Sequence, residues 1–193
     1  MNPDHLSLLF TGHMVDLPGR PNPRFPSELV DAAGAEIERR IRRHTADRIQ
    51  QNVKGFASLA RGGDILFHEV CRKLGFETVI VLPFSLDKFL KTSVEGVESG
   101  EWEKRFRKLW DETPPARRRD LDRPADNEAK RNEAYVACNE FMLDLASREG
   151  HVQLITLWDE STGDGTGGTS HFIEEVKQKS GKRPEIINPK ELY

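Results

Sequence analysis

Cysteine is scarce in this sequence, because Cys71 and Cys138 are the only two among 193 residues. No Cys-x-x-Cys pair occurs, and neither cysteine has histidine partners at the spacing of a zinc site. These absences argue against a disulfide framework and a metal centre, so we expect no metal ligands and no resident cofactor. Both cysteines lie among apolar residues of expected helices, which predicts two buried free thiols in a reducing compartment.

Long apolar runs are missing as well. No stretch approaches the roughly 18 apolar residues that cross a bilayer. The first residues, MNPDHLSLLFTGH, contain neither a basic leader nor a cleavage site of small residues, which argues against a secretory signal. We therefore expect a cytoplasmic protein without a membrane partner. No internal repeat or low-complexity tract is present, so nothing indicates a solenoid or a disordered chain.

Neither sign of charge dominates the chain. The 29 basic and 32 acidic residues leave a net charge of −3, which argues against a globally basic nucleic-acid binder. Charged residues make up 32% of the chain, above the common ~25%, so a densely charged surface or segment is expected. At 193 residues the chain has the length of a single domain and buries a sizeable core.

Short apolar runs alternate with amphipathic helices along the chain. The expected strands cover residues 6–11, 55–60, 78–82, 152–157 and 184–187. Helices are expected from Ser27 to Ile41 and over residues 62–74, 127–148 and 169–179. This alternation predicts a Rossmann-like, doubly wound α/β domain over residues 1–193, with a mainly parallel sheet of about five strands.

Residues 85–126 interrupt the alternation as a charged helical insertion. An aromatic stripe at helical spacing predicts that a helix of the insertion packs on the domain, through Trp102, Phe106, Leu109 and Trp110. Its basic residues Arg105, Arg107, Lys108 and Arg117–Arg119 interleave with acidic ones. A solvated face of mixed charge is favoured over a nucleic-acid patch, so nucleic acid is not an expected partner.

Ligands of doubly wound sheets bind at the carboxyl ends of the strands, near the point where the strand order reverses. In this chain that rule selects four loops, at residues 11–16, 58–64, 83–84 and 158–169. Thr11, Gly12 and His13 end the first strand, where they either border a ligand or form a plain turn. Histidine titrates near neutral pH, so His13 is a candidate general base.

The loop before the last long helix is rich in glycine. Gly165, Thr166, Gly167, Gly168 and Thr169 lead into that helix, where close backbone approach and free N–H groups favour a phosphate. The pattern matches neither the Walker sequence nor G-x-G-x-x-G after a first strand. The alternative is a glycine-rich surface loop without a ligand.

A second glycine turn precedes the helix at residues 62–74. Gly62 and Gly63 provide backbone donors, and Arg61 is suited to pair with a phosphate. Asp64 either acts in a site or only stabilises the helix N-terminus. His68 follows one turn later, either as an acid–base or metal partner of Asp64 or, as we favour, as a structural histidine.

One further pair of polar residues lies on the long helix at residues 127–148. Asn132 and Asn139 are seven positions apart and share one face of that helix. These amides either reach a ligand or cap neighbouring loops, since buried amides need partners.

Two motifs resemble a known superfamily. Residues Ala60–Ile65 with His68, Gly75 and Thr78–Leu82 resemble the A-R-G-x-D-x-x-x-H…G-x-x-T-V-x-V-L stretch of DNA-processing protein A. The loop at residues 165–169 is similar in position to the P-G-G-x-G-T-x-x-E loop of the Lonely Guy phosphoribohydrolases. Both families belong to the SLOG superfamily of Rossmann-like domains, so the resemblance implies a nucleotide or a nucleotide-derived ligand.

The chain departs from both families at informative positions. The phosphoribohydrolases carry a catalytic glutamate three residues after the loop threonine, whereas here the first glutamate is Glu174. The primary hypothesis is therefore a binding or sensor domain for a nucleotide-derived small molecule, with a second copy or an effector protein as its partner. The alternative is an enzyme acting at an N-glycosidic bond, with Asp64, Asp164 or Glu174 as its catalytic carboxylate.

Overall fold

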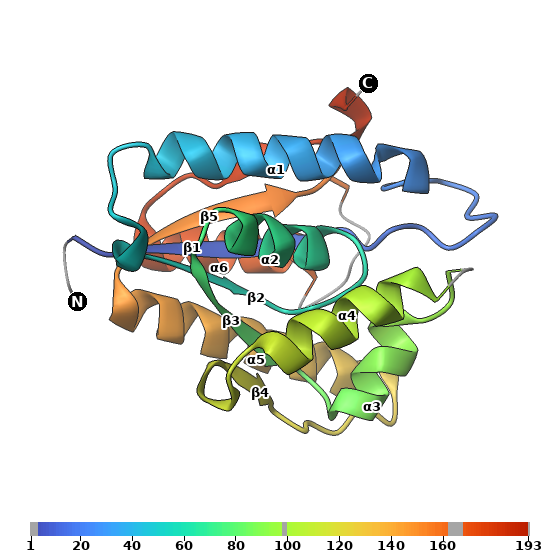
Figure 1. Cartoon of the computed structure of the whole chain (residues 1–193). Coiled ribbons are helices and arrows are strands. Elements are labelled where there is room, and N and C mark those ends of the chain that lie inside the picture. Colours follow the sequence, from blue (N-terminus) through green and yellow to red (C-terminus); the bar gives the residue numbers. More distant parts are fainter. Residues whose placement is uncertain (1–3, 98–99, 162–167, 193) are drawn as a thin grey trace.

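The computed structural model describes residues 4–97, 100–161 and 168–192. Its centre is one all-parallel sheet of six strands in the order β4-β3-β2-β1-β5-β6 (Figure 1). The strands are β1 (Leu6–Gly12), β2 (Val53–Ala57), β3 (Glu77–Leu82), β4 (Arg118–Asp120), β5 (His151–Leu157) and β6 (Glu185–Ile187). The predicted class, a Rossmann-like doubly wound α/β fold, is confirmed, and the sheet has one strand more than expected.

The sixth strand lies inside the segment that was predicted to be a helical insertion. Arg118–Asp120 form the edge strand β4, which pairs in parallel with Ile80–Leu82 of β3. Sequence patterning missed it because the three residues are all charged and follow a proline-rich turn. A charged edge strand is physically reasonable, since charge at an exposed edge opposes pairing with another chain.

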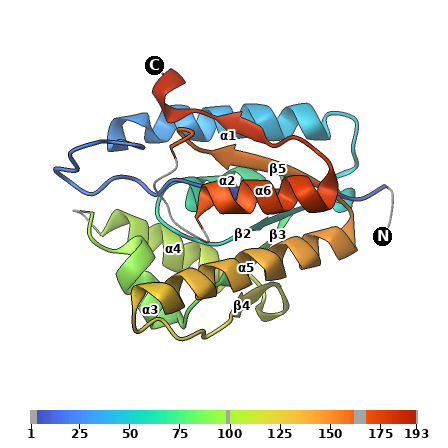
Figure 2. The same ribbon diagram turned by 180° about the vertical axis from the view of Figure 1, so that it is seen from behind.

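Helices cover both faces of the sheet. The helical elements are α1 (Val30–Thr45), α2 (Gly63–Lys73), α3 (Leu86–Phe89), α4 (Glu101–Glu112), α5 (Glu128–Glu149) and α6 (Thr169–Ser180). A π-helical turn, η3 (Leu90–Val94), follows α3. The described residues also form the 3-10 turns η1 (Ser27–Leu29), η2 (Gln50–Asn52), η4 (Pro115–Arg117) and η5 (Pro189–Glu191). α1, α2 and α4 lie on one side of the sheet, and α5 and α6 lie on the other (Figures 1 and 2).

The hydrophobic core is split by the sheet into two layers. Leu8 and Phe10 of β1 belong to the layer beneath α1 and α2, whereas Leu9 between them packs with α5 and α6. This alternation follows from the two-residue period of a strand and explains why β1 is buried on both faces. The two cysteines are free and buried, as predicted, and each lies in a different layer.

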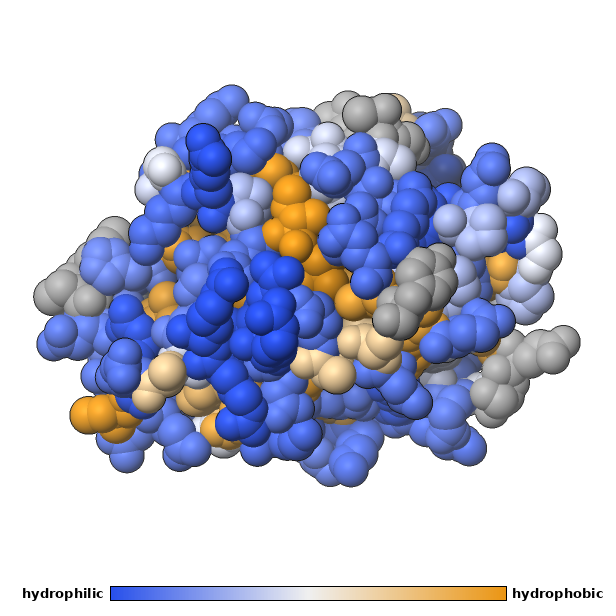
Figure 3. Space-filling model, turned by 90° about the horizontal axis from the view of Figure 1, so that it is seen from above, coloured by the Kyte–Doolittle hydropathy of each residue, from blue (hydrophilic) through white to orange (hydrophobic). Residues whose placement is uncertain are grey.

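The charged segment at residues 85–126 packs as the aromatic stripe predicts. Trp102, Phe106 and Leu109 of α4 are buried, and Phe106 stacks on Trp110. Hydrophilic residues cover most of the face seen from the side of α1, with an apolar stripe near its middle (Figure 3). Within the described residues no helix has the length and apolar character needed to cross a bilayer.

Candidate functional site

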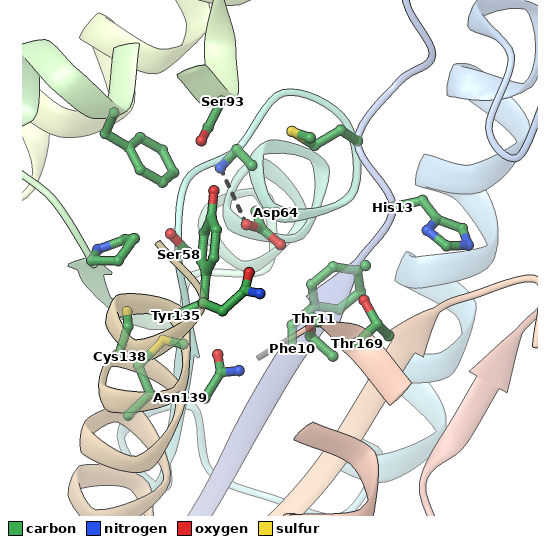
Figure 4. A pocket seen from close by; sticks show the side chains of 18 of the residues that line it. Phe10, Thr11, His13, Ser58, Asp64, Ser93, Tyr135, Cys138, Asn139 and Thr169 are labelled. Carbon is green, nitrogen blue, oxygen red and sulfur yellow. Dashed lines mark hydrogen bonds between the residues drawn. The ribbon is translucent and has the colours of Figure 1, made fainter. Parts of the chain in front are cut away.

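A cavity of about 230 Å³ lies at the carboxyl ends of the central strands. Its walls come from the end of β1, the loop after β2, the first turns of α2 and α6, the turn η3 and one face of α5 (Figure 4). β1 separates β2 from β5, so the strand order reverses beside it. The pocket therefore occupies the position at which doubly wound sheets bind their ligands.

Each of the four loops selected from the sequence contributes to this pocket. Thr11 and Gly12 come from the end of β1, Ser58 from the loop after β2, Pro83 from the end of β3, and Thr169 from the start of α6. Parallel strands bring their carboxyl ends to one edge of the sheet, which is why segments distant in the sequence meet here. The general location of the pocket was thus predictable from the strand pattern.

Asp64 is the acidic residue of the pocket lining. It lies in the first turn of α2, its side chain is buried, and the residue is only 7% exposed. Its Oδ2 accepts a hydrogen bond from the backbone N–H of Ala60 at 3.1 Å, the one donor it has among the described residues. Burial raises the pKa of Asp64 to about 7, opposed by the Ala60 hydrogen bond. A carboxyl group of this kind is present in both protonation states at neutral pH.

One face of α5 supplies most of the polar groups opposite Asp64. Asn132, Tyr135 and Asn139 line the pocket at helical spacing, with Cys138 and Met142 beside them. Both asparagines therefore belong to the pocket lining. Figure 4 shows the Tyr135 hydroxyl directed toward Ser93 of η3. Burial raises the pKa of Tyr135, so its hydroxyl remains protonated at neutral pH.

His13 lines the pocket, and its ring interacts with the carboxylate of Asp159, which is not a lining residue. Its Nε2 lies 2.8 Å from Oδ1 of buried Asp159, which also accepts from the Ser161 hydroxyl at 2.6 Å. Lys190 approaches the other Asp159 oxygen at 3.1 Å. Burial alone raises the pKa of Asp159, but the hydrogen bonds from Ser161, His13 and Lys190 together lower it, so the carboxylate stays ionised. The His13 ring points away from Asp64 in Figure 4.

The turn around Gly62, which was predicted to bind a phosphate, lies outside the pocket lining. Gly62 has a φ of +95°, and a Cβ there would lie 2.6 Å from the backbone nitrogen of Val15. The N–H of Gly63 already donates to the carbonyl of His13. Arg61 donates to the carbonyls of Val15 and Glu95. These three residues are therefore absent from the pocket lining, because they bind neighbouring backbone segments.

Two other predicted residues also lie outside the pocket. Glu174 is exposed on α6 and pairs with Lys177, so it is not placed to act as a catalytic carboxylate. His68 is fully buried, and its Nε2 donates to the carbonyl of Ser58 at 2.9 Å, in agreement with a structural role. Burial lowers the pKa of His68 to about 4, against the Ser58 hydrogen bond, so its ring is neutral.

The glycine-rich loop is only partly covered by the structure. Gly168 and Thr169 are described and line the pocket, with Thr169 as the first residue of α6. Asp164, Gly165, Thr166 and Gly167 lie outside the described residues. The N-terminal end of α6, a helix of 12 residues, borders the cavity. This arrangement favours anionic groups.

Several lining residues were not recognised from the sequence. Arg24 comes from the proline-rich loop after β1, and Phe89 and Ser93 come from the charged segment. Tyr135 on α5 is another such lining residue. Its position between Asn132 and Asn139 on one helical face was the available signal, whereas the contribution of Arg24 and Ser93 depends on tertiary packing.

The fold and pocket together define a Rossmann-like α/β protein with a polar pocket at the switch point of its sheet. No group of three or more His, Cys, Asp or Glu side chains suited to a metal ion occurs among the described residues. No protein-family model matches the chain, and no curated protein is significantly similar to it.

Proposed function

We propose that the chain binds a nucleotide-derived small molecule in this pocket. The observation that carries the proposal is the position of a polar cavity at the switch point, between the start of α6 and the polar face of α5. The resemblance of residues 60–65 and 165–169 to SLOG motifs supports the same class of ligand.

The two ends of the pocket suit the two parts of such a ligand. A phosphate is favoured at the start of α6, where Thr169 offers a hydroxyl and the helix dipole is positive. Arg24, a cation of the lining, adds charge for the same group. A base or sugar fits against Asp64 and the amides of Asn132 and Asn139, which offer acceptors and donors.

The size of the cavity limits the ligand. About 230 Å³ lies below the roughly 300–1,000 Å³ of common ligand pockets. This favours a mononucleotide or a nucleoside over a dinucleotide. In a sensor, binding is transmitted to a second copy of the chain or to an effector protein.

Binding is testable with a panel of nucleosides and nucleoside mono-, di- and triphosphates. Thermal shift identifies the ligand, and calorimetry then measures its affinity for the wild type and for Thr169→Val. Loss of the threonine hydroxyl is expected to weaken a phosphorylated ligand by about tenfold. Glu174→Gln, on the same helix but outside the pocket, serves as the control with unchanged affinity. No stabilisation by any member of the panel contradicts the proposal.

A second candidate function is cleavage of an N-glycosidic bond, which Asp64 favours specifically. Hydrolysis breaks the bond between the sugar carbon and the base nitrogen, while water supplies hydroxyl to the sugar and a proton to the base. An ionised Asp64 would stabilise the positive charge that develops on the sugar or accept the proton of the water.

Chromatography of wild-type incubations with each nucleotide tests this activity directly. Release of free base that Asp64→Asn abolishes, with ligand binding retained, supports an enzyme. Binding without release of base in the wild type supports the sensor. Asp64→Asn is a suitable comparison because the amide oxygen still accepts the hydrogen bond of Ala60.

A further inference from the structure

Arg61 is a buried cation that takes no part in the pocket lining, yet it connects the segments that form it. The residue is 5% exposed. Its Nε donates to the carbonyl of Val15, and its Nη1 donates to the carbonyl of Glu95, both at 3.1 Å. Its backbone N–H donates to the carbonyl of Ser93 at 2.9 Å. No carboxylate lies within salt-bridge distance of Arg61 in the part of the chain that the structure describes.

The two segments held by Arg61 form different walls of the pocket. The segment 89–95, with the π-helical turn η3, contributes Phe89 and Ser93. The segment 13–15 contributes His13 and continues from the end of β1. The hydroxyl of Tyr135 on α5 is directed toward Ser93 (Figure 4). A displacement of segment 89–95 would thus remove one wall of the pocket.

We propose that Arg61 is a positioning residue that fixes segment 89–95 against segment 13–15 and so sets the shape of the pocket without touching the ligand. An effect of Arg61 on ligand affinity rests on the proposed function, whereas its role in holding segment 89–95, one wall of the pocket, does not.

The chemistry of arginine suits this position. A guanidinium group holds its donors in a rigid planar fork, so it bonds to two carbonyls from different segments in a fixed geometry. Lysine carries its donors on one nitrogen at the end of a flexible chain. The conservative Arg61→Lys change therefore keeps the charge and part of the hydrogen bonding but loses the fixed geometry of the two bonds. It should hold segment 89–95 more firmly than Arg61→Ala does and less firmly than the wild type does.

The two cysteines provide built-in reporters that need no ligand. Cys138 is 2% exposed and lines the pocket one helical turn after Tyr135. Cys71 is fully buried in α2 and packs against Gly55, away from the pocket lining. Opening of the wall exposes Cys138 alone, whereas global unfolding exposes both thiols.

Alkylation by iodoacetamide, read at each cysteine by peptide mass spectrometry, tests the proposal in native buffer. We expect Arg61→Ala to accelerate modification of Cys138 by about tenfold or more and to leave the Cys71 rate within about twofold of wild type. Arg61→Lys should give an intermediate Cys138 rate. Arg105→Ala, which removes an arginine paired with Glu69 outside the pocket, is the matched control with both rates unchanged.

Two outcomes overturn the proposal. Equal acceleration of both thiols, in Arg61→Ala or in Arg61→Lys, shows that Arg61 supports the whole fold. An unchanged Cys138 rate in both variants shows that Arg61 does not hold the wall. If Arg61→Ala does not fold, the decision rests on Arg61→Lys.

The ligand measurements remain separate from the thiol measurements. Weaker binding of a panel nucleotide to Arg61→Lys, together with faster Cys138 modification, supports both proposals. Selective acceleration of Cys138 without any nucleotide binding in the wild type supports the wall and contradicts the proposed function.

Discussion

At the scale of single residues, Asp64 and His68 show opposite responses to burial in the same helix. Burial disfavours the charged form of each, so it raises the pKa of the carboxyl group and lowers that of the imidazole. As pH falls toward 4, protonation of Asp64 stabilises the folded state while protonation of His68 destabilises it. The two effects offset each other in the wild type, and single substitutions are needed to reveal them.

Asp64→Asn removes the first of these effects. The folded pKa of about 7 exceeds the unfolded value of 3.8, so ionised Asp64 destabilises the fold as pH rises through this range, by up to ~4 kcal/mol. We expect the variant to gain stability over wild type above about pH 7 and to lose this advantage near pH 4. Urea unfolding across this range measures the difference, and an advantage independent of pH contradicts the assignment.

His68→Gln removes the second effect. The folded pKa of about 4 lies below the unfolded 6.5, so the stability contributed by neutral His68 is lost as pH falls from 6.5 to 4. Glutamine retains a donor for the carbonyl of Ser58 but does not titrate. The variant should be less stable than wild type near neutral pH and should lose less stability on acidification. A parallel acid response in both proteins argues against this role.

Gly62 illustrates a residue whose backbone conformation is required. Its φ of +95° and the 2.6 Å approach of a Cβ to the Val15 nitrogen make Gly62→Ala strained in two ways. We expect destabilisation of about 2–4 kcal/mol by denaturant unfolding. Gly19→Ala is the control, because Gly19 has a φ of +75° but nothing within 4 Å of its Cβ. Equal losses in the two variants would show that the close approach is unimportant.

At the scale of elements, Asp159 connects β1, β5 and the C-terminal turn η5. His13, Ser161 and Lys190 all approach its carboxylate, which lies directly after β5. Asp159→Ala removes the carboxylate that buried His13 and half-buried Ser161 share, and should destabilise the fold by about 2–4 kcal/mol. Lys190→Gln removes only an exposed partner and should change stability by less than about 1 kcal/mol. Similar losses in these two variants would contradict the buried network.

The elements also show which local signals were sufficient. β3 was predicted because Thr78–Leu82 is β-branched and apolar, and α5 was predicted from its amphipathic pattern. In the structure Asn127 caps α5 by accepting a hydrogen bond from the N–H of Lys130. β4 was missed, because pairing with β3, not local propensity, makes Arg118–Asp120 a strand. Strand pairing is a tertiary property that three charged residues do not reveal.

At the scale of the whole molecule, the fold rule located the pocket but not its chemistry. The strand order brings four predicted loops to one edge, and Thr11, Asp64 and Thr169 meet there. The same packing buries Arg61. Residues 13–15 cross over Gly62, and the Arg61 side chain donates a hydrogen bond to the carbonyl of Val15 in that segment. Patterns along the sequence indicate which loops are neighbours, whereas the direction of each side chain depends on how those loops pack.

The charge distribution of the whole molecule leads to a prediction about nucleic acid. Half of the basic cluster of the charged segment is paired with carboxylates, since Arg105 pairs with Glu69, Arg117 with Glu77 and Arg118 with Asp111. This pairing lowers the positive charge that can displace the counterions of a duplex, and the net charge of −3 opposes approach. We expect no saturable binding of a labelled duplex of about 20 base pairs by fluorescence anisotropy at about 0.15 M salt. Saturable binding that weakens steeply with added salt would instead identify this segment as a nucleic-acid surface.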